Sequence, residues 1–162
     1  MTDYRRIVCA TDFSPASELA VSRGDDLAKR LGATLHLVHV VQDPRQEPWS
    51  AEGLAMNVGD LVDEWVREAE RQLEALAAKC ASSTVTACRV GRPVQQILEY
   101  VGEVKGDVLV VGSHGHGFVA HMLLGSVAER LVRRAPCPVL TVRGSARAEQ
   151  APEAALSAAG RV

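Results

Sequence analysis

The sequence predicts an α/β protein with an open, five-stranded parallel sheet in the strand order 3-2-1-4-5 and helices on both faces. Short apolar runs rich in β-branched residues alternate with segments whose apolar residues recur at helical spacing, which is typical of a parallel sheet built from right-handed crossovers. One run, residues 33–41, is almost continuously apolar, as expected of a strand covered on both faces. A length of 162 residues and a hydrophobic fraction of 47% suit one globular domain.

The first two strands flank a helix with clear boundary residues. Residues 5–11 form the first strand. The helix that follows begins after Ser14, an N-cap residue placed before Pro15, and ends at Gly32. Residues 33–41 form the second strand. Two prolines and two glycines then interrupt the pattern over residues 42–59, so we expect an insertion or lid segment there.

A second helix is predicted over residues 60–80. Its apolar side chains fall on one helical face, and they are Leu61, Trp65, Ala69, Leu73 and Leu76. Core packing is therefore the simplest interpretation of Trp65.

The remaining elements repeat the alternation. Residues 84–90 form the third strand, Pro93 opens a helix over residues 93–104, and residues 107–112 form the fourth strand. A fourth helix over residues 126–135 precedes the fifth strand, residues 137–143, which we expect at a sheet edge because Pro138 cannot donate a ladder hydrogen bond. Residues 1–144 thus form the domain, and residues 145–162 form a C-terminal tail without a motif.

Composition argues against several classes of partner. The formal net charge of −2 offers no strong field for nucleic acid or anionic lipid. Three arginines near the end of the fourth helix, Arg130, Arg133 and Arg134, are interpreted as a solvated face that compensates the helix dipole. The N-terminal residues contain no long apolar stretch suited to a signal peptide or membrane span. We therefore expect a cytoplasmic protein that binds neither nucleic acid nor membrane.

The four cysteines, Cys9, Cys80, Cys88 and Cys137, form no CxxC pair and lie within or beside predicted core elements. Reduced, buried thiols are the favoured interpretation over a disulfide or a metal site.

A glycine-rich loop follows the fourth strand at the point where this strand order reverses direction. Ligands of open parallel sheets bind at the carboxyl ends of the strands beside such a switch. The glycines of this loop, among them Gly112 and Gly115, have no Cβ atom, so they can adopt positive φ and bring backbone N–H groups close to an anion. Gly125 and Ser126 begin the fourth helix, whose unpaired N–H groups also favour negative charge, although simple helix capping explains this pair equally well.

The spacing of these residues differs from that of the Walker A loop and of the G-x-G-x-x-G fingerprint. Gly112, two residues, Gly115, nine residues, then Gly125 and Ser126 (G-2x-G-9x-G-S) resembles the nucleotide-binding signature of the universal stress protein family, in its ATP-binding branch. The resemblance extends over residues 3–143: "IVCATDFS" is similar to the family's opening strand, "HLVHVV" to its second and "APCPVLTVR" to its last. It implies the adenine nucleotide alpha hydrolase-like fold.

The resemblance also implies a ligand and its contacts. Asp12 and the backbone near Ala10 and Val40 would meet the adenine and ribose, and Gly112 would approach the ribose. Phosphates would lie against Gly115, Gly125, Ser126, Val127 and Ala128, with a divalent ion, Mg²⁺ or Mn²⁺, completing the charge balance of ATP. The function implied is a nucleotide-dependent regulatory module in stress response that forms a homodimer through its fifth strand.

Two other functions stay open at this point. The same pocket could serve a slow ATPase or another phosphoryl hydrolase, but the sequence offers only Asp12 as a carboxylate at the strand ends, and we expect no dedicated catalysis. A metal-binding loop could use His114, His116 and His121, although a tetrahedral site needs a fourth ligand and no cysteine is adjacent. His36 and His39 lie in the second strand and are interpreted as hydrogen-bonded strand residues.

Overall fold

A computed structural model of the chain describes residues 4–44, 58–113 and 124–143. The elements in chain order are β1 (Arg6–Ala10), α1 (Pro15–Leu31), β2 (Thr34–Val41), α2 (Val58–Ala77), β3 (Thr84–Val90), α3 (Pro93–Glu103), β4 (Val108–Gly112), α4 (Ser126–Arg134) and β5 (Val139–Val142). The strands form one sheet in the order β3-β2-β1-β4-β5, and all neighbouring strands are parallel. The predicted fold class is confirmed.

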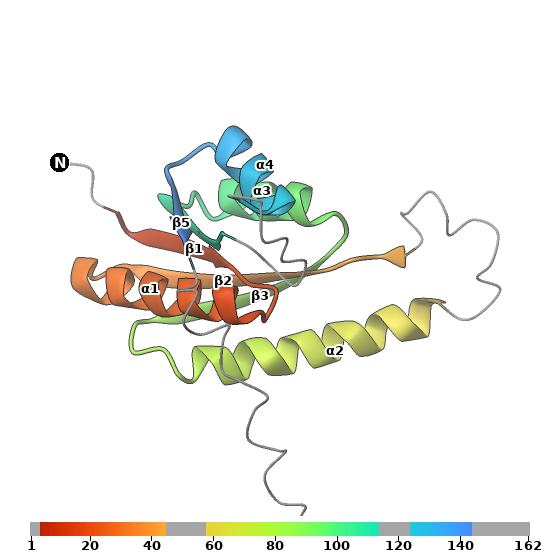
Figure 1. The fold of residues 1–162 in the computed structure, drawn as a ribbon. Coiled ribbons are helices and arrows are strands. Elements are labelled where there is room, and N and C mark those ends of the chain that lie inside the picture. Colours follow the sequence, from red (N-terminus) through yellow and green to blue (C-terminus); the bar gives the residue numbers. More distant parts are fainter. Residues whose placement is uncertain (1–3, 45–57, 114–123, 144–162) are drawn as a thin grey trace, which may run out of the picture.

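The sheet lies between two helical layers (Figure 1). Helices α1 and α2 cover one face, where Leu35, Leu37 and Leu73 are fully buried. Helices α3 and α4 cover the other face, where Val38, Leu109 and Leu131 are buried. Since neighbouring residues of a strand point to opposite faces, the central strands need apolar residues at both parities, which explains their unbroken hydrophobic runs.

The boundaries of α1 follow from the residues at its ends. The Ser14 hydroxyl accepts a hydrogen bond from the Ser17 amide at 3.3 Å, and Pro15 occupies the first turn. Gly32 ends the helix in the left-handed conformation with φ of 63°, which a residue without a side chain adopts most easily. The predicted start and end of this helix are confirmed.

Helix α2 departs from the prediction in which of its residues it buries. Ala69, Leu73 and Leu76 are buried as expected, but Leu61 is 40% exposed and Trp65 is 41% exposed. The interpretation of Trp65 as core packing is therefore wrong. The first turns of α2 lie beside a cavity at the ends of the strands, described below, and the packed layer begins only further along the helix.

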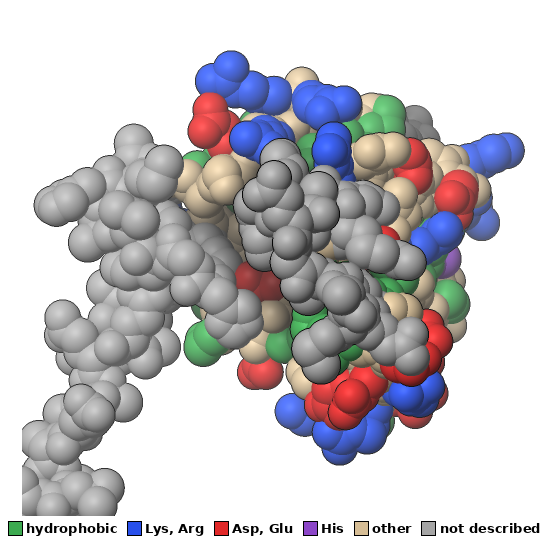
Figure 2. Space-filling model, turned by 90° about the vertical axis from the view of Figure 1, so that its right-hand side faces the viewer, with side chains coloured by type: hydrophobic (Ala, Val, Ile, Leu, Met, Phe, Trp, Pro, Cys, Tyr) green, Lys and Arg blue, Asp and Glu red, His purple; other side chains and the backbone are tan. Residues whose placement is uncertain are grey.

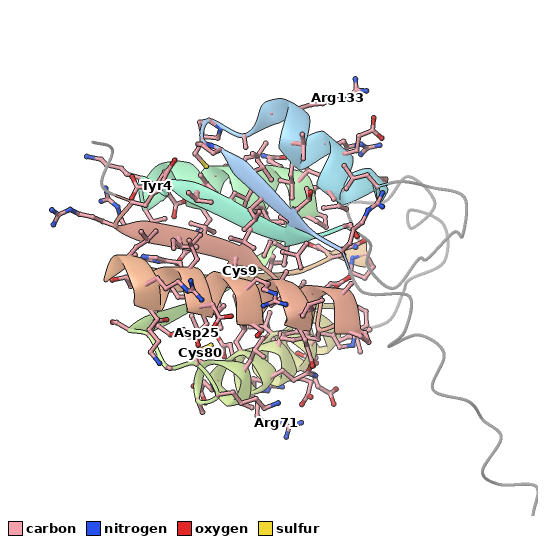
Figure 3. The ribbon with its side chains drawn as sticks, turned by 60° about the vertical axis from the view of Figure 1, so that its left-hand side comes forward. Tyr4, Cys9, Asp25, Arg71, Cys80 and Arg133 are labelled. Carbon is pink, nitrogen blue, oxygen red and sulfur yellow. The ribbon has the colours of Figure 1, made fainter. Side chains whose placement is uncertain are left out.

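Asp25 of α1 fixes the connection between α2 and β3 at the opposite end of the sheet. Its carboxylate accepts hydrogen bonds from the Ala81 amide at 2.9 Å and from the amide and hydroxyl of Ser82 at 2.9 and 2.6 Å. Figure 3 shows Asp25 on α1 facing the region of Cys80, beside the C-terminal end of α2. These bonds hold α1 against the chain that leads into β3.

All four cysteines carry free thiols, and the burial predicted for them is found in full only at Cys9. Cys9 is fully buried between α1 and the sheet, while Cys80, Cys88 and Cys137 are half-buried. Across the residues described, no helix combines the length and the apolar character that a membrane span needs.

Candidate functional site

A cavity of about 720 Å³ opens at the carboxyl ends of the strands, a volume within the range of small-molecule sites. The strand ends lie at the right of Figure 1, and in Figure 2 this end of the sheet faces the viewer. The wall is formed by the ends of β1, β2 and β4, by the first turns of α1, α3 and α4, and by the inner side of α2. This cavity therefore lies at the switch point at which the sequence predicts a ligand site.

The turn between β1 and α1 forms the floor and is closed by its own hydrogen bonds. Asp12 Oδ1 accepts from the Ser14 amide at 3.1 Å and from the Ser14 hydroxyl at 2.5 Å. The Phe13 amide donates to Thr11 Oγ1 at 3.0 Å, and Thr11 Oγ1 also lies 3.0 Å from Ser17 Oγ. This network fixes the Asp12 carboxylate at the cavity wall.

Phe13 occupies an unusual backbone conformation in this turn. Its φ is 62°, in the left-handed region that costs a residue with a side chain about 1–2 kcal/mol. The phenyl ring stacks on the imidazole of His39, with ring centroids 4.4 Å apart. Both residues line the cavity, so the strained residue belongs to the site, where such conformations tend to occur.

His39 is tied to the same turn. Its Nδ1 lies 2.8 Å from the carbonyl oxygen of Thr11. Burial lowers the pKa of His39, and the hydrogen bond to Thr11 together with the nearby Asp12 only partly oppose this effect. The imidazole is thus neutral at pH 7, with Nδ1 donating to Thr11, as the interpretation of a hydrogen-bonded strand residue requires.

The end of β4 and the start of α4 are held side by side. The Gly125 amide donates to the Ser113 carbonyl at 2.6 Å, and the Ser113 amide donates to the Val142 carbonyl of β5 at 2.8 Å. A side chain at Gly112 would meet the backbone of Ala16 and Ser17 at 3.1 Å. Gly112 therefore allows α1 to pass close to β4, and it needs no positive φ to do so.

The first turn of α4 faces the cavity without a capping side chain. Its N-cap residue is Gly125, with φ of −67° and ψ of 153°, and no side chain caps this turn. Within the described residues no hydrogen bond satisfies the amides of Ser126, Val127 and Ala128, and all three line the cavity. Free amides and the helix dipole are features that favour an anion at the start of a helix.

Eight of the nine residues expected at the ligand line the cavity, namely Ala10, Asp12, Val40, Gly112, Gly125, Ser126, Val127 and Ala128. The ninth, Gly115, lies outside the described residues, as do His114, His116 and His121. Positive φ, which the sequence suggested as the use of the glycines, is absent at Gly112 and Gly125.

Sequence reasoning missed the part of the wall on the α1–α2 side of the sheet. Phe13, His39, Trp65, Glu68 and Gln72 line the cavity there. Two signals were available: His39 has the parity of Leu37 in β2, which points to the α1–α2 layer, and Trp65 precedes Ala69 by one turn of α2.

The other histidine of β2, His36, lies away from the cavity. His36 Nδ1 is 3.1 Å from the Tyr100 hydroxyl, and the Arg89 guanidinium lies 5.2 Å from the centroid of the Tyr100 ring. Burial and the charge of Arg6 lower the pKa of His36. Over residues 4–44, 58–113 and 124–143, no group of three His, Cys, Asp or Glu side chains could hold a metal ion.

Comparisons with known proteins agree with this architecture. Residues 3–143 match the model of the universal stress protein family. Universal stress protein MJ0531 of Methanocaldococcus jannaschii is 32% identical over 140 residues, which cover 86% of this chain and 82% of the relative. A universal stress protein of Thermus aquaticus is 32% identical over 143 residues and is covered over 99% of its length.

Solved structures show the same fold. A universal stress protein in complex with cAMP superposes with a TM-score of 0.61 at 30% identity, covering 89% of this chain and all of that one. Protein MJ0577 superposes with a TM-score of 0.77 at 23% identity, covering 89% of this chain and 99% of its own. The family model spans most of the sequence, and the described cavity lies within it. The chain belongs to the universal stress protein family.

Proposed function

We propose that this protein binds ATP together with a divalent ion, and that it acts as a nucleotide-dependent regulatory module in stress response. The observation that carries the proposal is the uncapped first turn of α4, which opens into the cavity beside the end of β4. A related universal stress protein, 30% identical to this chain, was solved with cAMP, which supports an adenine nucleotide as the ligand.

The dipole of α4 supports one orientation of the nucleotide. The exposed arginines of this helix, Arg130, Arg133 and Arg134, do not line the cavity, and Arg133 pairs with Glu129. Phosphates at the amides of Ser126, Val127 and Ala128 would lie at the positive end of the helix dipole, with Gly115 of the adjoining loop as a further expected contact.

The rest of the nucleotide would lie over the strand ends. Ala10, Val40 and Gly112 provide apolar or side-chain-free surface there, and Asp12 offers a carboxylate for ribose hydroxyls. Mg²⁺ or Mn²⁺ would arrive with the nucleotide, since Mg²⁺ binds largely through phosphate oxygens and water and the described side chains form no metal cluster. The Ser126 hydroxyl, beside the free amides of α4, is the side-chain oxygen that we propose for that shell.

Hydrolysis is not part of the proposal. A catalytic base must reach a water beside the phosphates, whereas Asp12 Oδ1 already accepts two hydrogen bonds from Ser14 in the turn that it closes. We expect the nucleotide to act by occupancy, through a homodimer that pairs two copies of β5.

Titration calorimetry of ATP with and without Mg²⁺ tests the proposal. Ser126→Pro removes one amide and the hydroxyl, yet proline suits the first helical position and the extended backbone of Gly125. Ser126→Ala, the matched control, removes the hydroxyl alone. We expect about a tenfold loss of affinity for the proline variant and a smaller one for alanine. Absence of binding by the wild type at millimolar ATP and Mg²⁺ would refute the proposal.

A further inference from the structure

The cavity extends beyond the surface that the nucleotide signature accounts for. Val40 has the parity of Val38 and faces the α3–α4 layer, as do Val111 and Ala128. His39 and Phe13 lie on the other face, toward α1 and α2, and Trp65 of α2 lines the same cavity. The carboxyl ends of the strands therefore divide the cavity into two sides. We call the side toward α1 and α2 the α2-side pocket, and it is lined by Phe13, His39, Trp65, Glu68, Ala69 and Gln72.

The α2-side pocket presents hydrogen-bond acceptors. Because the Thr11 carbonyl can only accept, His39 Nδ1 carries the ring hydrogen, and Nε2 of the neutral ring is an acceptor with no partner among the described residues. Gln72 Nε2 donates to Glu68 Oε1 at 2.7 Å. The Arg71 guanidinium already occupies both oxygens of the same carboxylate, at 2.6 to 3.0 Å, so the Gln72 carbonyl oxygen is the further acceptor in this pocket. A ligand that donates hydrogen bonds matches these two acceptors.

The apolar part of the α2-side pocket is flat. Trp65 is 41% exposed although it lies one turn before the buried Ala69, so the described chain leaves part of its side chain uncovered. Phe13 and His39 add a stacked pair of rings. Aromatic faces bind other planar rings in offset or edge contacts, which favours a planar ligand over a branched one.

We propose that the α2-side pocket is a subsite for a planar heteroaromatic ring that carries hydrogen-bond donors, with Trp65 as its stacking surface and His39 Nε2 as its acceptor. The ring is either that of a separate nucleoside or the base of the bound nucleotide, which would then lie on the α2 side of the strand ends and not, as the resemblance implies, near Val40. The inference deepens the proposed function. Only the second of these two sources requires the bound nucleotide that we propose.

Tryptophan fluorescence tests the subsite directly, because the chain has two tryptophans, Trp49 and Trp65. In a Trp49→Phe variant, Trp65 is the sole fluorophore. Adenosine, which has the ring and its amino group but no phosphate, should change the emission of Trp65 in a saturable manner. Unchanged emission at millimolar adenosine and at millimolar ATP overturns the proposal.

The acceptor is tested by comparing adenosine with purine riboside, which lacks the amino donor. We expect adenosine to bind about three- to tenfold more tightly, as one hydrogen bond allows. His39→Asn retains a side-chain N–H for Thr11 but has no atom in place of Nε2, and it should abolish this preference. His39 is excluded as the acceptor if adenosine and purine riboside bind the wild-type protein with equal affinity. It is also excluded if a folded His39→Asn variant still prefers adenosine to the same extent.

Two further ligands separate this proposal from the proposed function. If calorimetry detects ATP, and ATP both alters Trp65 emission and blocks adenosine, the ring is the base of the nucleotide itself. If adenosine still alters the emission at saturating ATP, the ring belongs to a second molecule. ATP binding without any Trp65 response to either ligand refutes the subsite alone, whereas an adenosine response without binding of ATP or tripolyphosphate refutes the proposed function alone.

Discussion

The imidazole of His39 lies over the phenyl ring of Phe13, with the ring planes inclined by 29°. This pair joins β2 to the turn after β1, because His39 also hydrogen-bonds Thr11 in that turn. Phe13 reaches the pair only through a left-handed backbone, with φ of 62°. The contact thus offsets a local conformational cost at the cavity wall.

Two substitutions at Phe13 separate the conformational cost of its left-handed backbone from the stabilisation that its ring contact with His39 provides. Phe13→Ala removes the ring and retains the unfavourable φ, whereas Phe13→Gly removes the ring and relieves the backbone. We expect both variants to be less stable than the wild type, with the glycine variant more stable than the alanine variant by about 1 kcal/mol. Urea unfolding gives both differences, and an alanine variant as stable as the glycine variant would contradict the conformational argument.

Asp25 should make stability depend on pH in the acidic range. Burial alone would raise the pKa of Asp25, but hydrogen bonds from Ala81 and Ser82, with the charge of Lys29, outweigh it and lower the pKa. A carboxyl whose pKa is lower in the folded state stabilises the fold above its unfolded value of about 3.9, and this contribution disappears as the pH falls through the folded pKa.

The corresponding variant is Asp25→Asn. It should lower the free energy of unfolding by about 1 kcal/mol at pH 7, a modest value because the group is partly exposed to solvent, and the difference from the wild type should shrink below about pH 4. Asp26→Asn is the matched control, since Asp26 forms only an exposed ion pair with Arg23 at 3.7 Å. Equal effects of the two variants at pH 7 would argue against the role of Asp25.

The edge of β5 should carry the proposed homodimer. The Pro138 carbonyl accepts a hydrogen bond from Leu109 of β4, and the Val142 carbonyl accepts one from Ser113, the residue after β4. The alternation of strand hydrogen bonding therefore turns the N–H and C=O groups of Val139 and Thr141 outward. Leu140, at 42% exposure, adds apolar surface. Two such edges can pair about a two-fold axis.

Thr141→Pro removes an outward N–H and should convert a dimer to a monomer at tens of micromolar protein in light scattering. Thr141→Val, which retains the N–H, should remain a dimer. Thermal unfolding of both variants checks that the sheet is intact. A monomeric wild type, or a dimer that survives a folded Thr141→Pro variant, would rule out pairing through this edge.

The thiols should differ in reactivity. Cys9 has no exposed surface, and burial, with a smaller contribution from Cys80, raises the pKa of its thiol well above the ordinary range. A variant that retains Cys9 alone should therefore not react with a thiol reagent until it is unfolded, because thiolate is the reactive form. A variant that retains only the half-buried Cys137 should react in the native state, and equal rates for the two would contradict this assignment.

Local signals were sufficient for most of the fold. Ser14, Pro15 and Gly32 mark the ends of α1 because the backbone groups at helix ends require particular residues nearby in sequence. The α3–α4 side of the cavity could likewise be predicted from the sequence, because Gly125, Ser126 and Ala128 lie close together in the chain and all line the cavity.

The α2-side pocket depends on contacts that no local pattern encodes. The spacing of apolar residues in α2 gives a helical face, but it does not give the point at which the packed layer ends, and so Trp65 was misplaced in the core. His39 of β2 meets Phe13 of the turn after β1, a residue distant from it in the sequence. The close approach of the α1 backbone is enough to explain why a glycine occupies position 112. From the sequence alone this packing role cannot be distinguished from contact with a ligand.

The hydrogen bond from Gly125 to Ser113 brings the two ends of the intervening segment together at 2.6 Å. The entropy of closing a loop whose ends are fixed rises only with the logarithm of its length, by about 0.6 kcal/mol per doubling. A variant with a different number of residues between Ser113 and Gly125 should therefore lose little stability while β4 and α4 remain where they are. The same junction is a suitable place at which to graft a segment from another member of the family without redesigning the domain.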